Sequence, residues 1–321
     1  MKIWMYIILI LITMLALLYL LIVNPVSTVF DNTIETAVER AELERHVNFL
    51  CAMDPPRSFE QTESLNKCAD YIALQFVNAG LPTERQHFKD GSYAFQNVIA
   101  QYNPEAKERV VLGAHYDVCG PYQGADDNAS GVAGLLELAR VFSTNKPQLE
   151  YGIDFVAYST EEPPYFRTNL MGSAVHAESL LQDSTSVKLM VVLEMIGYFN
   201  EEKGSQQYPI GALKAVYPTT ANFIAIVGRT KEYGVVRKFK KKMMTASQLP
   251  VASINTPVIF EGIDFSDHRN YWSRGMKAIM ITNTSFFRTP HYHTPNDTPE
   301  TLNFEKMTEV VKGTYWAITH L

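Results

Sequence analysis

Short apolar segments alternate with segments of helical periodicity along most of this chain, and this alternation restricts the fold more than any other feature. Apolar runs of strand length cover residues 97–101, 110–114, 153–159, 189–196, 223–228 and 278–283. Apolar residues at helical spacing predict helices over residues 33–51, 60–79, 130–142, 170–181, 231–247 and 304–320. Strands that are apolar on both faces need helices on both sides of their sheet. The expected fold class is therefore α/β, with a mixed, mostly parallel central sheet sandwiched by helices.

The composition fits one globular unit and argues against one class of partner. The chain has 321 residues, of which 46% are hydrophobic, so it can bury a large core without disulfides. Its formal net charge is −6, whereas proteins that bind nucleic acid need a basic surface. Neither an internal repeat nor a second composition regime divides the chain. We expect one domain over residues 35–321 and no nucleic-acid partner.

The N-terminus carries a second strong pattern. Residues 3–23 form one apolar run, broken only by Thr13, and as a helix this run spans about 30 Å, the hydrocarbon thickness of a bilayer. A cleaved signal peptide usually has a shorter apolar region, followed by small residues at the cleavage site. Here no such site follows the run. The pattern therefore favours an uncleaved transmembrane signal anchor over residues 1–23, with a linker over residues 24–34.

The charges on either side of this run predict its orientation. Lys2 is the only positive charge before it, and Asp31, Glu35 and Glu39 are among the acidic residues that follow. The positive-inside rule then places the N-terminus in the cytoplasm. We expect a single-pass protein whose main domain is extracytoplasmic, either periplasmic or extracellular.

The three cysteines do not form a disulfide framework. Cys51 and Cys68 could pair in an oxidising compartment, but burial as small apolar side chains is the interpretation that we favour. Cys119 either lines a pocket or packs as an ordinary buried thiol.

Several candidate metal ligands lie where predicted strands end, which is where open α/β sheets place their ligand sites. His115 ends the strand over residues 110–114, and Asp117, two residues later, is placed to orient its imidazole. Glu161 and Glu162 follow the strand over residues 153–159. Glu194 interrupts an otherwise apolar strand, and a buried glutamate requires a cationic partner.

Two further candidates lie on loops. Asp126 and Asp127 occupy a turn that Gly124 and Gly131 bound, just before a predicted helix. Helix capping does not require two adjacent aspartates, so one of these carboxylates could bridge two cations. His293 lies in the loop after the last predicted strand. Each candidate alone has a commoner explanation, such as a capped helix, a solvated acidic turn or a structural histidine.

The combination has far more weight than any single member. Two imidazoles and three carboxylates suit two zinc ions, each with one histidine and one terminal carboxylate, and both sharing a bridging carboxylate. Glu161 is left over as an acid/base. The candidate metal ligands are His115, Asp127, Glu162, Glu194 and His293.

The ordered motifs between Val110 and Asp297 resemble metallopeptidase family 28, the aminopeptidases with two zinc ions in one site. The resemblance implies that His115 and Glu194 bind one zinc ion and that Glu162 and His293 bind the other. It also implies that Asp127 bridges the two ions and that the peptide bond after it is cis, as in many relatives. The family usually has aspartate where this chain has Glu194.

The resemblance also implies roles for residues that do not bind metal. Asp117 would orient His115, and Glu161 would be the general base. Ser266-Asp267-His268 resembles a further family signature that lines the site. Asp267, His268 and Tyr292 are accordingly candidates for substrate binding or for support of the site.

The implied function is a zinc-dependent exopeptidase that removes N-terminal residues from peptides. In such an enzyme a hydroxide held by two metal ions attacks the peptide carbonyl, and Glu161 moves the proton to the leaving amine. Two alternatives remain open. One is an acyltransferase of the glutaminyl cyclase type, which works with one zinc ion, and the other is a receptor-like relative without enzymatic activity.

Overall fold

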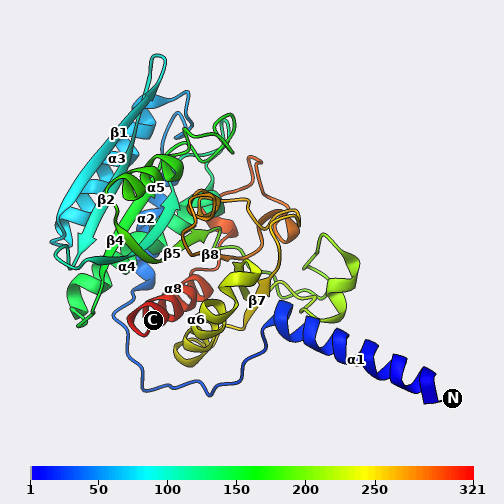
Figure 1. Cartoon of the computed structure of the whole chain (residues 1–321). Helices are drawn as coiled ribbons and strands as arrows, with labels where there is room; N and C mark the ends of the chain where they lie inside the picture. Colours follow the sequence, from blue (N-terminus) through cyan, green and yellow to red (C-terminus); the bar gives the residue numbers. More distant parts are fainter. Residues whose placement is uncertain (1) are drawn as a thin grey trace.

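The computed structural model describes residues 2–321, and in this part of the chain the strands form one eight-stranded sheet in the order β1-β2-β4-β3-β5-β8-β6-β7. Figure 1 shows the sheet at the centre of the main body. The strands are β1 (Thr83–Asp90), β2 (Tyr93–Tyr102), β3 (Glu108–His115), β4 (Gly152–Tyr158), β5 (Ser186–Glu194), β6 (Ile224–Gly228), β7 (Val251–Asn255) and β8 (Ala278–Thr282).

The centre of the sheet is parallel and its edges are mixed. Strands β4, β3, β5 and β8 run parallel to one another, whereas β2 pairs antiparallel with both β1 and β4. At the other edge β6 is antiparallel to β8 and parallel to β7. Because the four central strands share one direction, their carboxyl ends meet at the same edge of the sheet. This topology confirms the mixed α/β sheet that the sequence predicts.

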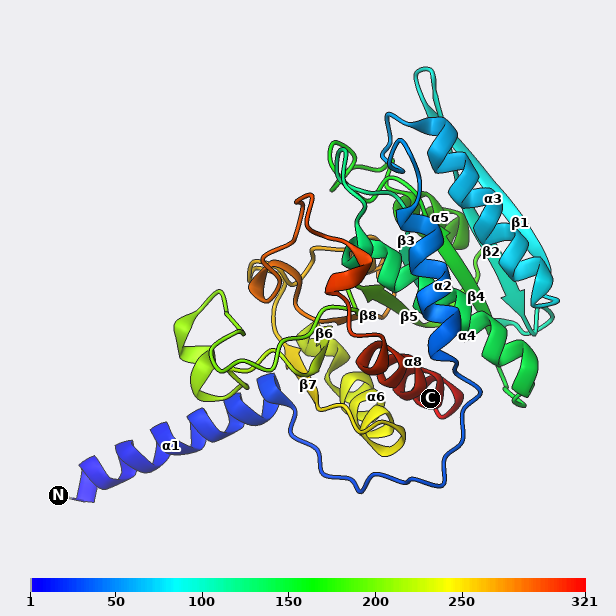
Figure 2. The same ribbon diagram turned by 180° about the vertical axis from the view of Figure 1, so that it is seen from behind.

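Helices cover both faces of the sheet, as Figures 1 and 2 show from opposite sides. Alternate strand residues point to opposite faces, so Val110 and Leu112 join one core while Val111 joins the other. The larger core also includes residues of α2, α3, α4, α6 and α8, and the smaller core includes residues of α5 and α7. These helices are α2 (Arg40–Cys51), α3 (Thr62–Asn78), α4 (Gly131–Asn145), α5 (Gly172–Gln182), α6 (Tyr233–Ala246), α7 (His268–Ser273) and α8 (Phe304–Thr319).

The structure differs from the sequence-based elements in a few places. The helix predicted over residues 33–51 is wrong over 33–39, which have no regular structure before α2 begins at Arg40. The backbone of this segment forms a hydrogen bond to a distant side chain, because the Glu39 N–H donates to the buried carboxylate of Glu137. The sequence pattern did not predict β1, a largely polar and exposed edge strand, nor the short β7 and α7.

Cys51, Cys68 and Cys119 are all free among the described residues. Cys51 and Cys68 are buried, which confirms the interpretation of these two as packed thiols. Burial raises the pKa of both thiols to about 11, so they stay protonated at neutral pH.

The N-terminal helix α1 (Lys2–Val23) projects away from the main body in both views (Figures 1 and 2). Among the described residues, Ile3–Val23 is the one helix long and apolar enough to cross a membrane. Met1, the first residue of the predicted anchor, lies outside the described residues. The chain then runs without regular structure along α6, where the Asp31 N–H donates to the Thr245 carbonyl at 2.9 Å, before α2 begins.

A buried ion pair joins β3 to β4 near the start of both strands. The Arg109 guanidinium donates to the Asp154 carboxylate, with Nη2 2.6 Å from Oδ1, and both side chains are almost fully buried. Arg109→Met leaves Asp154 buried without its cation, so we expect the folded state to lose about 3–5 kcal/mol of stability. Thermal unfolding of the full chain in detergent measures this loss.

The double variant Arg109→Met/Asp154→Leu is the matched control. It replaces both charges with apolar side chains, and it should recover most of the lost stability. Equal destabilisation of the single and double variants would contradict this account of the pair.

Candidate metal centre

The carboxyl edge of the sheet brings the predicted ligands together. His115 is the last residue of β3, and Glu194 is the last residue of β5. Glu162 lies in the turn that follows β4, and His293 lies in the loop after β8. Residues far apart in sequence therefore meet because neighbouring parallel strands end at one level.

The carboxylate of Asp127 divides these side chains into two pairs. Its Oδ1 lies 3.3 Å from Nε2 of His115, which in turn lies 3.5 Å from Oε2 of Glu194. Its Oδ2 lies 3.1 Å from Nε2 of His293, which lies 3.2 Å from Oε1 of Glu162. Each oxygen of Asp127 thus faces one histidine, which lies beside one glutamate, an arrangement that suits a carboxylate shared by two ions.

Asp117 ties the first pair to the turn after β4. Its two oxygens accept the backbone N–H groups of Glu161 and Glu162, both at 3.1 Å. Nδ1 of His115 lies 3.4 Å from Oδ1 of the same carboxylate. One buried aspartate therefore bonds to the backbone of the two adjacent glutamates and also lies beside the imidazole.

Residues around the ligands adopt left-handed backbone conformations that side chains other than glycine seldom adopt. The φ angles are 59° at Thr160, 51° at Met195 and 52° at His293. Thr160 is β-branched, so its conformation is strained, and its hydroxyl compensates by donating to the carbonyls of Ser159 (2.6 Å) and Leu170 (2.7 Å). These turns end the strands abruptly and direct the glutamates into the cluster.

The loop that carries Asp127 is held on several sides. The Asp297 carboxylate accepts the N–H groups of Asp126 and Asp127 at 2.8 and 3.1 Å. Gly124 has φ 58°, and a Cβ there would lie 2.2 Å from the carbonyl oxygen of Asp127, so this turn requires glycine. The Asp127–Asn128 peptide bond is cis, as the resemblance implies.

The side chains on either side of Asp127 bind this loop to the end of β5. The Asn128 amide donates to the Leu193 carbonyl at 2.9 Å and accepts the Met195 N–H at 3.0 Å. Asp126 accepts the Gly197 N–H at 2.8 Å. The loop that carries Asp127 is therefore held in place against the strand that ends in Glu194.

Glu194 has the longer side chain where the family usually has aspartate, and its position is fixed by a neighbour. The Ser266 hydroxyl donates to Oε2 of Glu194 at 2.6 Å. That same oxygen faces His115. The extra methylene is thus accommodated without taking the carboxylate out of the cluster.

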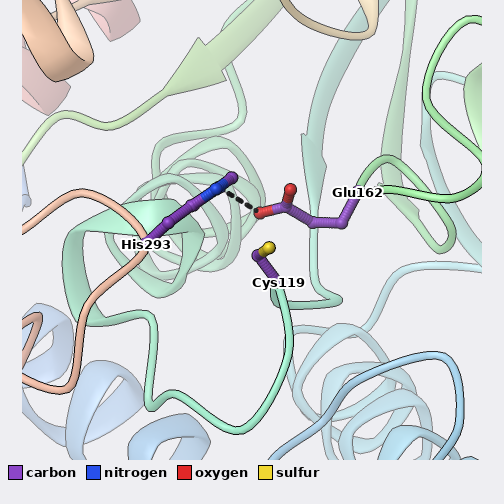
Figure 3. Close-up of side chains that lie close together, drawn as sticks. All are labelled: Cys119, Glu162 and His293. Atoms are coloured by element: carbon purple, nitrogen blue, oxygen red, sulfur yellow. Dashed lines mark hydrogen bonds and ion pairs between the residues drawn. The ribbon is translucent and has the colours of Figure 1, made fainter.

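Cys119 lies beside the second pair. Its sulfur, a carboxylate oxygen of Glu162 and a ring nitrogen of His293 lie within 4.8 Å of one another. Figure 3 shows the Cys119 side chain directed toward this pair. The thiol is therefore a further potential ligand beside this pair.

The electrostatics of the cluster favour positive charge. Burial raises the pKa of Glu162 to about 7, and burial raises that of Glu161 well above its usual value. Although burial lowers the pKa of His293, Asp127 and the other polar neighbours raise it to about 12. Likewise the carboxylates around His115 outweigh its burial and raise its pKa.

The residues fit two divalent cations. A histidine must be neutral to bind a metal ion, and metal binding displaces its proton. Here a buried imidazole, His115, and a half-buried one, His293, are surrounded by carboxylates that favour a positive charge at each imidazole position. A cation between His115 and Glu194 and another between His293 and Glu162, with Asp127 between them, would satisfy this demand with the ligand types that zinc takes.

The remaining predicted site residues lie in different surroundings. Tyr292 lines a cavity of about 540 Å³ that also exposes Asp127, Glu161, Glu162 and His293. Asp267 and His268 are completely buried. His268 bonds through Nε2 to the Ile263 carbonyl at 2.8 Å, and in the described part of the chain the Asp267 oxygens have no hydrogen-bond partner.

Arg57 supports the site, and the sequence analysis did not identify it. This guanidinium is almost fully buried, and it donates to the carbonyls of Tyr116 (2.8 Å), Gly124 (2.7 Å) and Gln123. It thereby holds together the two ends of the loop between His115 and Asp127. An arginine after two prolines has the local pattern of a surface turn, so spacing alone carries no signal of this role.

Asp297 offers a test of how the loop supports metal binding. Asp297→Ala removes the acceptor of the Asp126 and Asp127 N–H groups, so the bridging carboxylate loses its orientation. We expect the zinc affinity to fall about 10- to 100-fold, as when other residues that orient metal ligands are removed. Competition with a chromophoric chelator measures this change.

Glu300→Ala is the matched control, because Glu300 is an exposed carboxylate on the same segment of chain. Its zinc affinity should equal that of the natural protein. Unchanged affinity in Asp297→Ala would show that the loop holds Asp127 without this contact.

A sequence profile described as peptidase family M28 matches residues 97–315. The uncharacterized protein YfbL of Escherichia coli (strain K12) is 45% identical over 280 residues, which are 85% of this chain and 85% of YfbL. A probable leucine aminopeptidase of Trichophyton verrucosum is 25% identical over 271 residues, which are 81% of this chain. The match covers 66% of that relative, so this chain spans just under two thirds of its length.

Solved structures share the fold. LapA aminopeptidase of Legionella pneumophila superposes with a TM-score of 0.68 at 22% identity, covering 92% of this chain and 77% of LapA. Fimbriiglobus ruber glutaminyl cyclase superposes with a TM-score of 0.66 at 19% identity, covering 92% of this chain and all of that one (100%). The fold is therefore common to a protein named as an aminopeptidase and to one named as a glutaminyl cyclase.

Proposed function

Because the chain belongs to peptidase family M28 and is thus a peptide hydrolase, we propose that it is a metallo-aminopeptidase that removes N-terminal residues from peptides. One observation carries the proposal. The Asp127 carboxylate lies between a His115–Glu194 pair and a His293–Glu162 pair. One of its oxygens faces His115 and the other faces His293. This arrangement supports two metal ions rather than the single ion of the cyclase alternative.

His115, Glu194 and Asp127 would hold one zinc ion, and His293, Glu162 and Asp127 would hold the other. Bound zinc ions supply Lewis acidity, which polarises a carbonyl and lowers the pKa of a nearby water. Asp117 positions His115, and the adjacent N–H groups of Glu161 and Glu162 bond to the same carboxylate. Cys119 stands close enough to the second pair to influence which metal ion is preferred.

Glu161 is the proton carrier in this proposal. Its carboxylate lies on the cavity wall, and one of its oxygens lies within 4.8 Å of ligand atoms of His115 and Glu162. It accepts a proton from the attacking water and delivers it to the amine nitrogen as the peptide C–N bond breaks. Burial raises the pKa of Glu161, and a raised pKa suits a group that must both take and return a proton near neutral pH.

We further propose that α1 anchors the protein in a membrane and that residues 35–321 form an extracytoplasmic catalytic domain. The end of α1 supports retention of this helix, because it is bonded into the domain. The Lys240 ammonium donates to the carbonyls of Val23 and Asn24, both at 3.3 Å, and the Ser253 hydroxyl donates to the Val23 carbonyl at 3.0 Å. Cleavage near residue 23 would remove these partners.

A peptide panel tests the proposed activity. The full chain in detergent, with added zinc, is incubated with mixed peptides that include some with N-terminal glutamine, and mass spectrometry identifies the products. We expect loss of single N-terminal residues. Loss of ammonia from the glutamine peptides alone would identify a cyclase instead, and loss of C-terminal residues would keep the hydrolysis but change the substrate end.

Glu161→Gln tests the assigned proton carrier. The amide keeps the shape of the side chain but cannot accept the proton, so we expect turnover to fall about 10²- to 10⁴-fold. Zinc content, measured by elemental analysis, should stay at the natural level because Glu161 is not a proposed ligand. Glu150→Gln, an exposed position, is the control and should retain full turnover. A fully active Glu161→Gln variant would exclude the role.

A further inference from the structure

The cavity over the metal cluster extends well beyond the space that the cluster needs. Its volume is about 540 Å³, and its walls include both Glu194 of the cluster and Ile22 of α1. Between them the lining is mainly apolar, with Leu213, Phe223 and Ile254 among its residues. A single chamber therefore joins the carboxylates to the end of the membrane helix.

The strand register gives the direction of this chamber. Glu194 in β5 pairs with Thr282 in β8, and Thr282 pairs with Ala225 in β6. Ala225 in turn pairs with Ala252 in β7. Glu194, Thr282, Ala225 and Ala252 all line the cavity. With strands about 4.8 Å apart, Ala252 lies roughly 14 Å from Glu194 across the sheet.

Helix α1 meets the domain at the far end of this row. Val23 at its C-terminal end accepts a hydrogen bond from Ser253 of β7, the neighbour of Ala252. The Asn24 amide donates to the Tyr233 carbonyl at 3.0 Å, and Arg237 donates to the Asn24 side chain at 3.2 Å. The position of the helix relative to the chamber is thus fixed by buried contacts.

Exposed apolar side chains surround the mouth of the chamber. Ile259, the neighbour in sequence of the lining residue Phe260, is 88% exposed, and such exposure is uncommon for isoleucine. Ile210, Phe260 and Phe286 are exposed and also line the cavity, so they lie at its mouth. The loop of residues 200–222 lies beside the end of α1 in both Figure 1 and Figure 2.

We propose that this mouth faces the bilayer that holds α1 and that the site acts on peptides whose apolar part is dissolved in that bilayer. The inference rests on the proposed aminopeptidase activity and adds the substrate class. The apolar part of the substrate enters along the lining of Leu213, Ala252 and Ile254 while the scissile bond reaches Glu161. An apolar chain then moves from lipid to an apolar wall without crossing water.

Two matched probes test the proposal with the full chain in phosphatidylcholine vesicles and added zinc. Leucylglycine amide is soluble in water, and leucylglycine dodecylamide carries the same scissile bond on a chain that partitions into lipid. Released leucine gives kcat/KM for each probe. We expect the dodecylamide to be preferred at least tenfold.

Ala252→Phe separates the role of the chamber from simple enrichment of the probe in the vesicle. A larger side chain at this position narrows the part of the chamber beside β7, whereas enrichment of the probe in the vesicle stays the same. We therefore expect the preference for the dodecylamide to fall at least tenfold. If this variant loses activity on both probes, Ile259→Glu decides, because a charge at the mouth should lower the same preference. Leu74→Glu is the control, because Leu74 is also an exposed apolar residue but lies on α3. This substitution should leave the preference unchanged.

The outcomes are distinguishable. Equal kcat/KM for the two probes, or a preference that neither Ala252→Phe nor Ile259→Glu reduces, overturns the membrane-fed chamber and leaves the aminopeptidase proposal intact. Hydrolysis of neither probe by the natural protein, with zinc bound and with no N-terminal residue released from the peptide panel, overturns the aminopeptidase activity itself.

Discussion

The sharing of one carboxylate between two histidine–glutamate pairs is the constraint on which the rest of this site depends. Concentrating Asp127, Glu162 and Glu194 in a buried space is costly unless positive charge lies among them. The fold meets this demand by ending neighbouring strands at one level and by binding the intervening loops with backbone N–H groups. Asp117 and Asp297 have similar structural roles. Each accepts hydrogen bonds from two consecutive N–H groups of a segment that carries a candidate ligand. Fixed dipoles thus replace the flexible water that would otherwise solvate these aspartates.

The sequence predicted the central architecture because buried parallel strands have a strong pattern. Each apolar run, from that containing Val110 to that containing Ala278, became a strand, and the helices between them followed. The edge strand β1 was missed for the same physical reason, since a half-exposed strand such as Thr83–Asp90 has little apolar pattern. The irregular segment before Arg40 was missed because its backbone partners come from distant side chains.

The candidate site was partly visible in the same way. Residues at strand ends have a local context, so His115, Glu162 and Glu194 could be grouped before any geometry was known. Arg57 could not be placed, because its role depends on which loops meet in space. Ser266 was grouped with the site by the resemblance alone, and its contact with Glu194 could not be predicted. A buried guanidinium that binds only carbonyls leaves no trace in spacing. Such supporting residues set the precision of a site, whereas the ligands set its chemistry.

The end of α1 has a consequence for how this protein can be studied. Its last turn contributes Ile22 to the wall of the catalytic chamber and places the Val23 carbonyl against Lys240 and Ser253. The helix therefore forms part of the cavity wall, in addition to the anchoring role proposed for it. A truncated form that begins after the helix would expose a buried ammonium and open one side of the chamber to water. The specificity measured for the truncated form would therefore belong to a differently shaped cavity from the one in the intact chain.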